Sequence, residues 1–377
     1  MLISFPHMGK LHLALARTFK LLDIPYLIPP LPGPAALQLG QELAPEGSCL
    51  PFCLVLGNMR EALNSGADTL IMIGGKGPCR FGYFVYLAER LLLDAGYKFK
   101  TLIIDKGYLW QDYTYLKKNG GFSGQALIAA AKHGWQLVVC DETLSALKRE
   151  YLPRALDPGK LNDYFTECSE ELTRTQSIAE ILQTHAKIEN HIKKTPLLPA
   201  SSVLRIGLVG DIYTLLEPYA NHEIEDYLQS NGVSVYKEMA VSRWIPNILL
   251  PWRKGFYMKE LLRDAYPYLQ STVGGFGLES VANTRKMGRR SVDGIIQLFP
   301  LGCMPEIVAQ SAINRICQKE HLPVLSITMD QHDSITGFKT RLEAFLEMLG
   351  RKKGTGIYNL HSPSSRCYKV LQRSRLD

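Results

Sequence analysis

The stretch TLIMIGGKGPCRFG, residues 69–82, joins an uninterrupted apolar run to a glycine-rich turn that contains Cys79. An apolar run of this kind is typical of a strand that is buried on both faces of a parallel sheet. The same order of signals recurs at residues 294–306, where Cys303 lies in the turn between an apolar run and a helix start. We therefore expect a doubly wound α/β fold in which both cysteines follow the carboxyl ends of buried strands.

Strand and helix signals alternate in two separate parts of the chain. In the first part they lie at residues 2–5, 12–22, 26–28, 51–65, 69–73, 84–95 and 101–104, with 136–139 as one more candidate strand. In the second part they lie at residues 205–209, 221–231, 233–235, 294–299, 305–320, 323–328 and 339–349. The sequence thus predicts the α/β class, with parallel-sheet domains at residues 1–115 and 201–349. A helical connection at 116–200 joins them, and a basic tail follows at 350–377.

The composition is that of an ordinary globular protein, with 46% hydrophobic and 21% charged residues among 377. The net charge of +7 arises mostly after Gly350, where seven Lys and Arg face Asp377 alone. We therefore expect no nucleic-acid partner for the body of the chain. No apolar run approaches the roughly 20 residues of a membrane span, and the N-terminus is interpreted as a first strand rather than a signal peptide. Eight cysteines without an export signal indicate reduced thiols and a cytoplasmic location.

Three cysteines stand where an apolar run or loop gives way to an expected helix: Cys49, Cys79 and Cys303. Backbone N–H groups at a helix N-terminus stabilise a thiolate. Three such thiolates that converge would hold an iron–sulfur cluster and leave one iron without a protein thiolate. The alternative is that they are ordinary buried thiols in tight turns. Glycines beside them, Gly75, Gly77 and Gly302, are expected to let the backbone approach the cofactor.

The remaining cysteines are assigned separately. Cys53 lies four residues after Cys49 and is either a fourth ligand or a residue of the core. Cys140, at the end of the candidate strand 136–139, and Cys317, within a helix, are expected in the core. Cys168 and Cys367 lie in polar surroundings without ligand spacing.

Further polar candidates follow strands of the second domain. His332 comes after the strand 323–328 and is either a general acid or base or an ordinary loop residue. Arg341 is expected to pair with Glu306 as a structural contact, or to bind an anionic substrate. The glycine-rich turn at residues 274–277 either faces the cleft between the domains, which is the favoured interpretation, or only reverses the chain. Neither a P-loop nor a dinucleotide fingerprint is present, so ATP or NAD binding is not predicted.

Seven short phrases of the chain together resemble one known family. They are SFPHMG (4–9), SCLPF (48–52), LGN (56–58), GPCRFGY (77–83), GDIY (210–213) with Asn221, CMPEIV (303–308) and TRLEAF (340–345). The combination resembles the 2-hydroxyacyl-CoA dehydratase component superfamily over about residues 1–349. Within it, the chain is most similar to the activase-related branch, also described as CoA-substrate-specific enzyme activase-like iron–sulfur proteins.

The resemblance implies two flavodoxin-like, Rossmann-like domains with a [4Fe-4S]-type cluster, or a double-cubane derivative, between them. It implies that Cys49, Cys79 and Cys303 are the cluster ligands. Its partners would be an ATP-hydrolysing iron–sulfur activator of actin/Hsp70-like fold, which donates a low-potential electron, and an acyl-CoA substrate. A homodimer or heterodimer is also expected by analogy.

The chain departs from the family pattern at three positions: Cys53 replaces an expected Lys, Phe276 an expected His, and Phe338 an expected acidic residue. Each change alters or removes a polar group near the expected cleft. The leading hypothesis is therefore a dehydratase-like or reductase-like electron-accepting component. The alternatives are a non-enzymatic electron or cluster carrier or scaffold, and a cluster-free paralogue.

Overall fold

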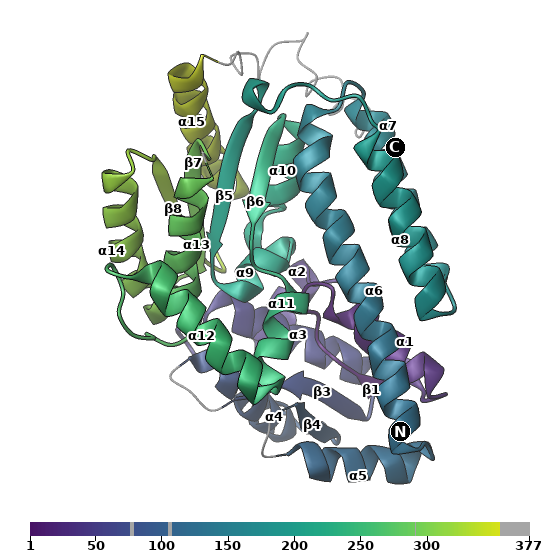
Figure 1. Cartoon of the computed structure of the whole chain (residues 1–377). Helices are drawn as coiled ribbons and strands as arrows, with labels where there is room; N and C mark the ends of the chain where they lie inside the picture. The colour runs from purple at the N-terminus through teal and green to yellow at the C-terminus, as the bar shows by residue number, and fades with distance from the viewer. Residues whose placement is uncertain (76–78, 105–107, 291, 355–377) are drawn as a thin grey trace.

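A computed structural model describes residues 1–75, 79–104, 108–290 and 292–354. Within these residues the chain forms two four-stranded sheets, and all their strand pairs are parallel. Figure 1 shows one sheet in the lower part of the molecule and the other in the upper part, each flanked by helices. The predicted α/β class with two parallel-sheet domains is therefore confirmed.

The first sheet has the strand order β2-β1-β3-β4. Its strands are β1 (Ile3–Ser4), β2 (Tyr26–Leu27), β3 (Thr69–Ile73) and β4 (Lys100–Ile104). Strand β3 is buried along its whole length, as its apolar run predicts. The helices that pack around this sheet are α1 (Leu11–Leu21), α2 (Pro34–Gln41), α3 (Leu50–Asn64), α4 (Phe84–Asp94) and α5 (Leu109–Gly120).

The second sheet repeats the same topology, with the order β6-β5-β7-β8. Its strands are β5 (Leu204–Gly210), β6 (Val233–Lys237), β7 (Gly294–Pro300) and β8 (Val324–Met329). The helices of this part are α9 (Ile212–Leu216), α10 (Ile224–Ser230), α11 (Val241–Leu249), α12 (Pro251–Ala265), α13 (Gly277–Arg289), α14 (Met304–Lys319) and α15 (Ile335–Lys353).

Three long helices connect the two sheets: α6 (Gly124–Tyr151), α7 (Pro158–Arg174) and α8 (Ile178–Lys193). In Figure 1 they stand side by side along one flank of the molecule. Helix α6 contacts α1 of the first part and β6 of the second, so it braces both sheets.

The candidate strand at residues 136–139 is wrong, because this segment lies inside α6. Helix α6 packs against α1, α7 and α8 at once, so it buries side chains on more than one side. Leu137 and Val138 are therefore both buried, although they are neighbours in the helix. The resulting apolar run resembles a buried strand in the sequence. Cys140 and Cys317 belong to the core as expected, and Cys168 is also buried there.

The final helix is longer than the sequence indicated, because α15 continues through Gly350 to Lys353. Ser334 caps its first turn by accepting a hydrogen bond from the backbone N–H of Gly337. Residues 355–377, which include Cys367 and most of the expected basic tail, lie outside the described part. Among the described residues, no helix is long and apolar enough to cross a membrane.

Helices α2 and α3 cross so closely that two glycines form their contact. A Cβ atom on Gly57 would lie 1.7 Å from the carbonyl oxygen of Ala36, and one on Gly40 would lie 1.9 Å from that of Cys53. Because both neighbours are backbone, neither can move without moving its helix. This contact fixes the position of the N-terminus of α3, where Cys49 lies.

We expect the Gly57→Ala variant to unfold at a clearly lower urea concentration than the wild type, by roughly 2 kcal/mol or more, since overpacking a backbone contact is costly. Gly255→Ala is the matched control, because Gly255 is exposed in α12 and a Cβ there would meet nothing within 4 Å. The control should be neutral or more stable by up to about 1 kcal/mol. Equal unfolding midpoints for the two variants would contradict the close crossing.

Candidate functional site

Both sheets place a cysteine at the same topological position. In an open parallel sheet, ligands bind beyond the carboxyl ends of the strands, where the strand order reverses. This point lies between β1 and β3 in the first sheet and between β5 and β7 in the second. Cys79 follows β3 and Cys303 follows β7, so each lies at the ligand-binding edge of its own sheet.

Three cysteines occupy the N-cap position of a helix. Cys49 precedes α3, Cys303 precedes α14, and Cys79 precedes the 3₁₀ helix Arg80–Tyr83. All three have extended backbone conformations and are partly buried free thiols. No capping hydrogen bond to their sulfurs is formed, although a backbone N–H lies near each of them.

The three thiols share one charged neighbour, Asp211. Burial is the largest cause that raises the pKa of each thiol, to about 12 for Cys49, and the charge of Asp211 raises all three further. Cys79 also raises the pKa of Cys303. The charge of Asp211 thus reaches Cys49, Cys79 and Cys303 alike, and we call these three residues the cysteine group.

Asp211 is a residue that the sequence reasoning missed. It directly follows β5, at the switch point of the second sheet, and it caps α9. Its carboxylate accepts hydrogen bonds from the backbone N–H and the hydroxyl of Thr214, each at 3.1 Å. The sequence could have indicated Asp211, because this residue follows the end of a strand just as Cys79 and Cys303 do.

The glycine-rich turn at residues 274–277 packs against the cysteine group, as expected. Gly275 has a positive φ of 49°, and a Cβ on it would lie 3.5 Å from Cys79 Sγ and 2.9 Å from Pro305 Cγ. A Cβ on Gly277 would lie 2.4 Å from the carbonyl oxygen of Pro305. Glycine therefore allows this turn to approach both Cys79 and the start of α14.

The other glycines predicted near the cofactor differ in their surroundings. The backbone N–H of Gly75 donates to the carbonyl oxygen of Gly82 at 3.1 Å, which closes the loop around Cys79. Gly302 has a positive φ of 75°, and a Cβ on it would meet nothing within 4 Å, so it serves the turn before Cys303. Gly77 lies outside the described residues. A direct role of these glycines in cofactor binding stays a prediction.

An aromatic row borders the cysteine group on one side. The ring of Phe81 lies 6.1 Å from that of Trp244, which lies 5.7 Å from that of Phe276. Phe276 stands where the resembled family has a histidine, so this wall is apolar in the present chain. The third departure, Phe338, packs 5.0 Å from the ring of His222.

Cys53 is a neighbour of Cys49 and raises the pKa of that thiol, whereas no such link joins His332 to the cysteine group among the described residues. Cys53 is buried in α3, and besides burial the charge that raises its pKa, to about 11, comes from Asp330 and not from Asp211. His332 is exposed in the turn after β8. The adjacent Gln331 ties that turn to the first domain by donating to the backbone oxygen of Ser48 at 2.5 Å. Their proposed roles as fourth ligand and general acid or base remain predictions.

The expected pair of Arg341 and Glu306 is wrong. Arg341 donates instead to the backbone oxygen of Ser326 at 3.0 Å. Glu306 is fully buried beside the cysteine group and accepts hydrogen bonds from Ser280 Oγ at 2.9 Å and Gln297 Nε2 at 3.0 Å. A neutral hydroxyl and a neutral amide therefore replace the guanidinium as its partners.

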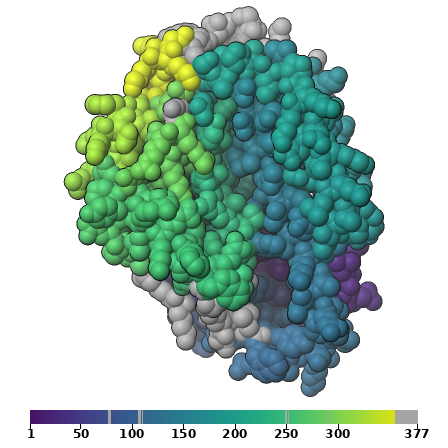
Figure 2. Space-filling view, in the orientation of Figure 1, coloured from purple at the N-terminus to yellow at the C-terminus, as the bar shows by residue number. Residues whose placement is uncertain are grey.

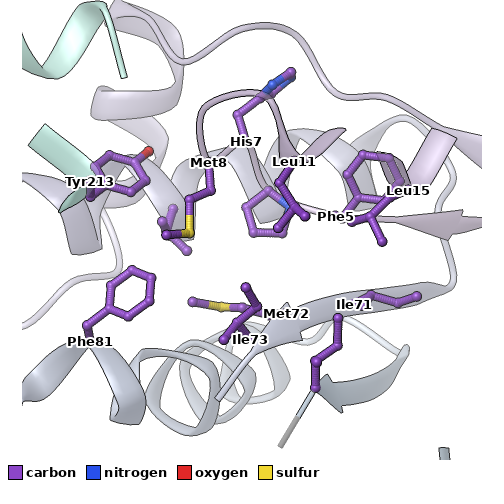
Figure 3. A pocket seen from close by; sticks show the side chains of 13 residues that line it. Phe5, His7, Met8, Leu11, Leu15, Ile71, Met72, Ile73, Phe81 and Tyr213 are labelled. Atoms are coloured by element: carbon purple, nitrogen blue, oxygen red, sulfur yellow. The ribbon is translucent and has the colours of Figure 1, made fainter. Parts of the chain in front are cut away.

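A small apolar pocket of about 20 Å³ lies beside this site. Figure 3 shows Met8, Met72 and Phe81 around it, with Tyr213 at its border. A space of this size holds about one water molecule, which would find few polar partners here. The pocket therefore offers no room for a substrate in the described conformation.

The donor set of the cysteine group suits an iron–sulfur cluster. Cys49, Cys79 and Cys303 are free thiols, and Gly275 leaves the space beside Cys79 Sγ clear of a side chain. Among the described residues, no three His, Cys, Asp or Glu side chains are gathered closely enough to hold a single metal ion. In a cubane cluster each thiolate binds a different iron, so its sulfurs lie further apart than around one ion. The raised pKa of the thiols means that binding must release their protons.

The fold and the cysteine group define a class of protein: two parallel α/β domains whose ligand-binding edges carry helix-capping thiols. Comparison with known families agrees with the resemblance seen in the sequence. Residues 213–349 match the family model of the 2-hydroxyglutaryl-CoA dehydratase D-component. This part of the chain is therefore similar to a component of the 2-hydroxyacyl-CoA dehydratases. The match includes Cys303 and not Cys49 or Cys79. No curated protein matches the chain significantly.

Stability should depend on pH through Glu306. Burial raises the pKa of this carboxyl from 4.5 to about 8, against the opposing effect of the hydrogen bonds from Gln297 and Ser280. Between these two values the folded chain keeps a proton that the unfolded chain releases. Stability therefore falls as the pH rises from 4.5 to about 8.

We expect the Glu306→Gln variant to lose part of this pH dependence, because glutamine does not titrate. The measurement is the urea midpoint of unfolding of the metal-free chain across that pH range. Glu320→Gln, an exposed change at the end of α14, is the control and should keep the slope of the wild type. If the urea midpoint of Glu306→Gln changed with pH as steeply as that of the wild type, the Glu306 carboxyl would have the same pKa in the folded and unfolded chain.

Proposed function

We propose that the chain is an iron–sulfur protein of the dehydratase type, the electron-accepting component of an ATP-dependent 2-hydroxyacyl-CoA dehydratase or reductase system. Its cluster would be held between the domains by Cys49, Cys79 and Cys303. The observation that carries the proposal is that these three helix-capping thiols, from three separate loops, share Asp211 as a neighbour. The family match over residues 213–349 supports the dehydratase-like part of the proposal.

The cluster, a [4Fe-4S] type or a double-cubane derivative, would supply a low-potential electron and an iron that can accept a substrate oxygen as a Lewis acid. The chain would contribute the surroundings. Backbone N–H groups of Phe52, Phe81 and Glu306 lie beside the three sulfurs and favour their charged form. The aromatic row that ends at Phe276 would exclude water from one side.

The proposed partners follow from the same assignment. An ATP-hydrolysing iron–sulfur activator of actin/Hsp70-like fold would deliver the electron, and an acyl-CoA thioester would accept it. A homodimer or heterodimer in the cytoplasm is proposed as the working form. In the present chain Phe276 replaces the histidine that the family pattern carries, so the site offers one polar side chain fewer to an acyl group.

A second function, an electron or cluster carrier or scaffold, would need a fully ligated cluster. Cys53 is the candidate fourth ligand for it, but its charged neighbour is Asp330 rather than Asp211. Cys53 also raises the pKa of Cys49, so a variant at Cys53 is needed to distinguish an open iron site from a fully ligated cluster. A cluster-free paralogue is the third hypothesis. Metal analysis distinguishes it from the electron-accepting component and from the carrier.

We expect the anaerobically purified or reconstituted chain to contain about four irons and four acid-labile sulfides, with an EPR signal after dithionite reduction. Cys49→Ser, Cys79→Ser and Cys303→Ser should each lower the iron and sulfide content strongly. Cys140→Ser is the control, because Cys140 is a buried free thiol in α6 and should leave the content unchanged. If none of the three variants alters the metal content, the cluster assignment is wrong.

The Cys53→Ser variant distinguishes the catalytic component from the carrier. A cluster with an open iron should persist in this variant with its EPR signal unchanged, whereas loss of iron would identify Cys53 as a ligand. Turnover of a 2-hydroxyacyl-CoA in the presence of the activator and ATP then tests the enzymatic function itself. A loaded chain that never turns over such substrates would support the carrier.

A further inference from the structure

The two domains are joined beside Cys49 by the turn that follows β8, residues 330–334, which we call the β8 turn. Residues 332–334 of this turn are exposed, whereas Gln331 is partly buried. Its amide nitrogen donates to the backbone oxygen of Ser48 at 2.5 Å, and its amide oxygen accepts from Gln41 Nε2 at 2.9 Å. One side chain of the second domain thus makes two hydrogen bonds to the first domain.

These two bonds hold both ends of the loop that leads to Cys49. Gln41 is the last residue of α2, and Ser48 directly precedes Cys49 at the start of α3. Residues 45–47, in the middle of the loop, are exposed. Surface loops are more mobile than the elements that they connect. The position of Cys49 therefore depends on how the ends of this loop are held.

The β8 turn is also fixed to the turn that carries Cys303. The backbone N–H of Leu301 donates to the carbonyl oxygen of Met329, the last residue of β8, at 2.9 Å. The N–H of Cys303 donates to the carbonyl oxygen of Pro300 at 3.0 Å, which closes the turn before α14. A short path of backbone and hydrogen bonds therefore runs from Cys303 through the β8 turn to Cys49, and it crosses from one domain to the other.

The β8 turn is braced by hydrogen bonds of its own. The backbone N–H of Asp330 donates to Asp333 Oδ2 at 2.7 Å, and Ser334 caps α15. Asp330 is also the charged residue that raises the pKa of Cys53, so the turn lies near the first turns of α3. Gln331 is therefore presented to the Cys49 loop from a turn whose shape is already fixed.

Close packing does not extend over the whole junction of the two domains. A cavity of about 370 Å³ lies where the N-terminal segment, α6 and the second domain meet. Figure 2 shows a hollow at this place, between the blue atoms of α6 and the green atoms of the second domain, with purple N-terminal atoms inside it. The fit of the two domains therefore depends also on specific contacts such as the hydrogen bonds of Gln331.

We propose that Gln331 is a positioning residue for the cysteine group. By holding the loop before Cys49 to the turn before Cys303, it keeps thiols of the two domains at the spacing that a single cluster requires. Ligands bind a rigid inorganic group well only where the residues behind them are held in place. The inference rests on the proposed function for the identity of the group that is bound, whereas the hold on the Cys49 loop is a property of the metal-free chain as well.

The first test measures the hold in the metal-free full chain. The rate at which iodoacetamide alkylates each cysteine is read by peptide mass spectrometry, in the wild type and in Gln331→Leu. We expect Cys49 to react about tenfold faster in the variant, the effect of losing one good hydrogen bond. Cys140, which is buried in α6, should keep its rate in the same sample, because it reports unfolding of the whole chain.

Two further variants accompany Gln331→Leu. Gln318→Leu is the matched control, because Gln318 is exposed in α14, and it should leave the alkylation of Cys49 unchanged. Gln41→Leu removes only one of the two hydrogen bonds and should accelerate Cys49 less than Gln331→Leu does. Combined with Gln331→Leu it should add nothing, since both changes break the same contact. Gln41→Leu also tests the contact by itself if Gln331→Leu fails to fold.

The second test uses the anaerobically reconstituted chain. The rate at which bathophenanthroline disulfonate extracts iron should be about tenfold higher in Gln331→Leu than in the wild type, because a mobile Cys49 leaves the cluster more often. Gln318→Leu should release iron at the rate of the wild type.

Three outcomes are decisive. Equal alkylation rates of Cys49 in Gln331→Leu and Gln318→Leu would overturn the proposal. So would acceleration of Cys49 and Cys140 by the same factor, because Gln331 would then stabilise the whole chain rather than the Cys49 loop. A wild-type chain that takes up no iron would overturn the proposed function instead, while selectively faster alkylation of Cys49 in Gln331→Leu would still support the hold on its loop.

Discussion

The site depends on one constraint: the carboxyl edges of two parallel sheets are held facing each other. In the loop after β1, a Cβ on Gly9 would lie 3.2 Å from Leu216 Cβ, and the Gly9 N–H donates to Glu217 at 2.5 Å. Across the same junction Gly275 of the second domain lies against Cys79 of the first. Buried side chains of both sheets belong to one continuous hydrophobic cluster, so the two edges cannot separate without exposing apolar surface. Helix α6 reinforces this by contacting both sheets.

The two facing sheet edges bring together ionisable side chains whose charged forms are costly to bury without a partner. Three thiols, Asp211 and Glu306 lie within one partly enclosed region, and burial raises the pKa of every one of them. Their anionic forms repel one another, so the metal-free chain favours protonated groups. A cationic inorganic centre would reverse this preference, because it replaces the thiol protons and supplies the missing positive charge. The electrostatics of the region thus agree with the proposed cluster.

The residues beside the cysteine group show how the chain differs from the family pattern. Phe276 continues an aromatic row through Trp244 to Phe81, where a histidine would have added a hydrogen-bonding group. Polar side chains, among them His7, His12 and Glu217, line a separate cavity of about 370 Å³. Tyr213 is fully buried, and besides burial the charges that raise its pKa are those of Glu217 in the cavity and Asp211 at the thiols. The segment from Asp211 to Glu217 therefore runs from the cysteine group to this cavity.

The sequence alone determined the architecture and the local setting of the thiols. Apolar runs such as β3 and β7 identified both parallel sheets, because a strand covered on both faces admits few polar residues. The proline and glycine pattern around Cys49, Cys79 and Cys303 placed each at a helix start, because such turns depend on neighbouring residues only.

Contacts between distant segments were decided only in three dimensions. Residues 136–139 form part of α6 and not a strand, since helices on several sides of α6 bury its neighbouring residues alike. Glu306 bonds to Ser280 and Gln297 rather than to Arg341, because packing of α13 and β7 around α14 chooses its partners. The influence of Asp211 on thiols of both domains likewise arises where loops of different sheets meet. Such contacts depend on how the two folded domains pack against each other. Local sequence patterns do not determine that packing.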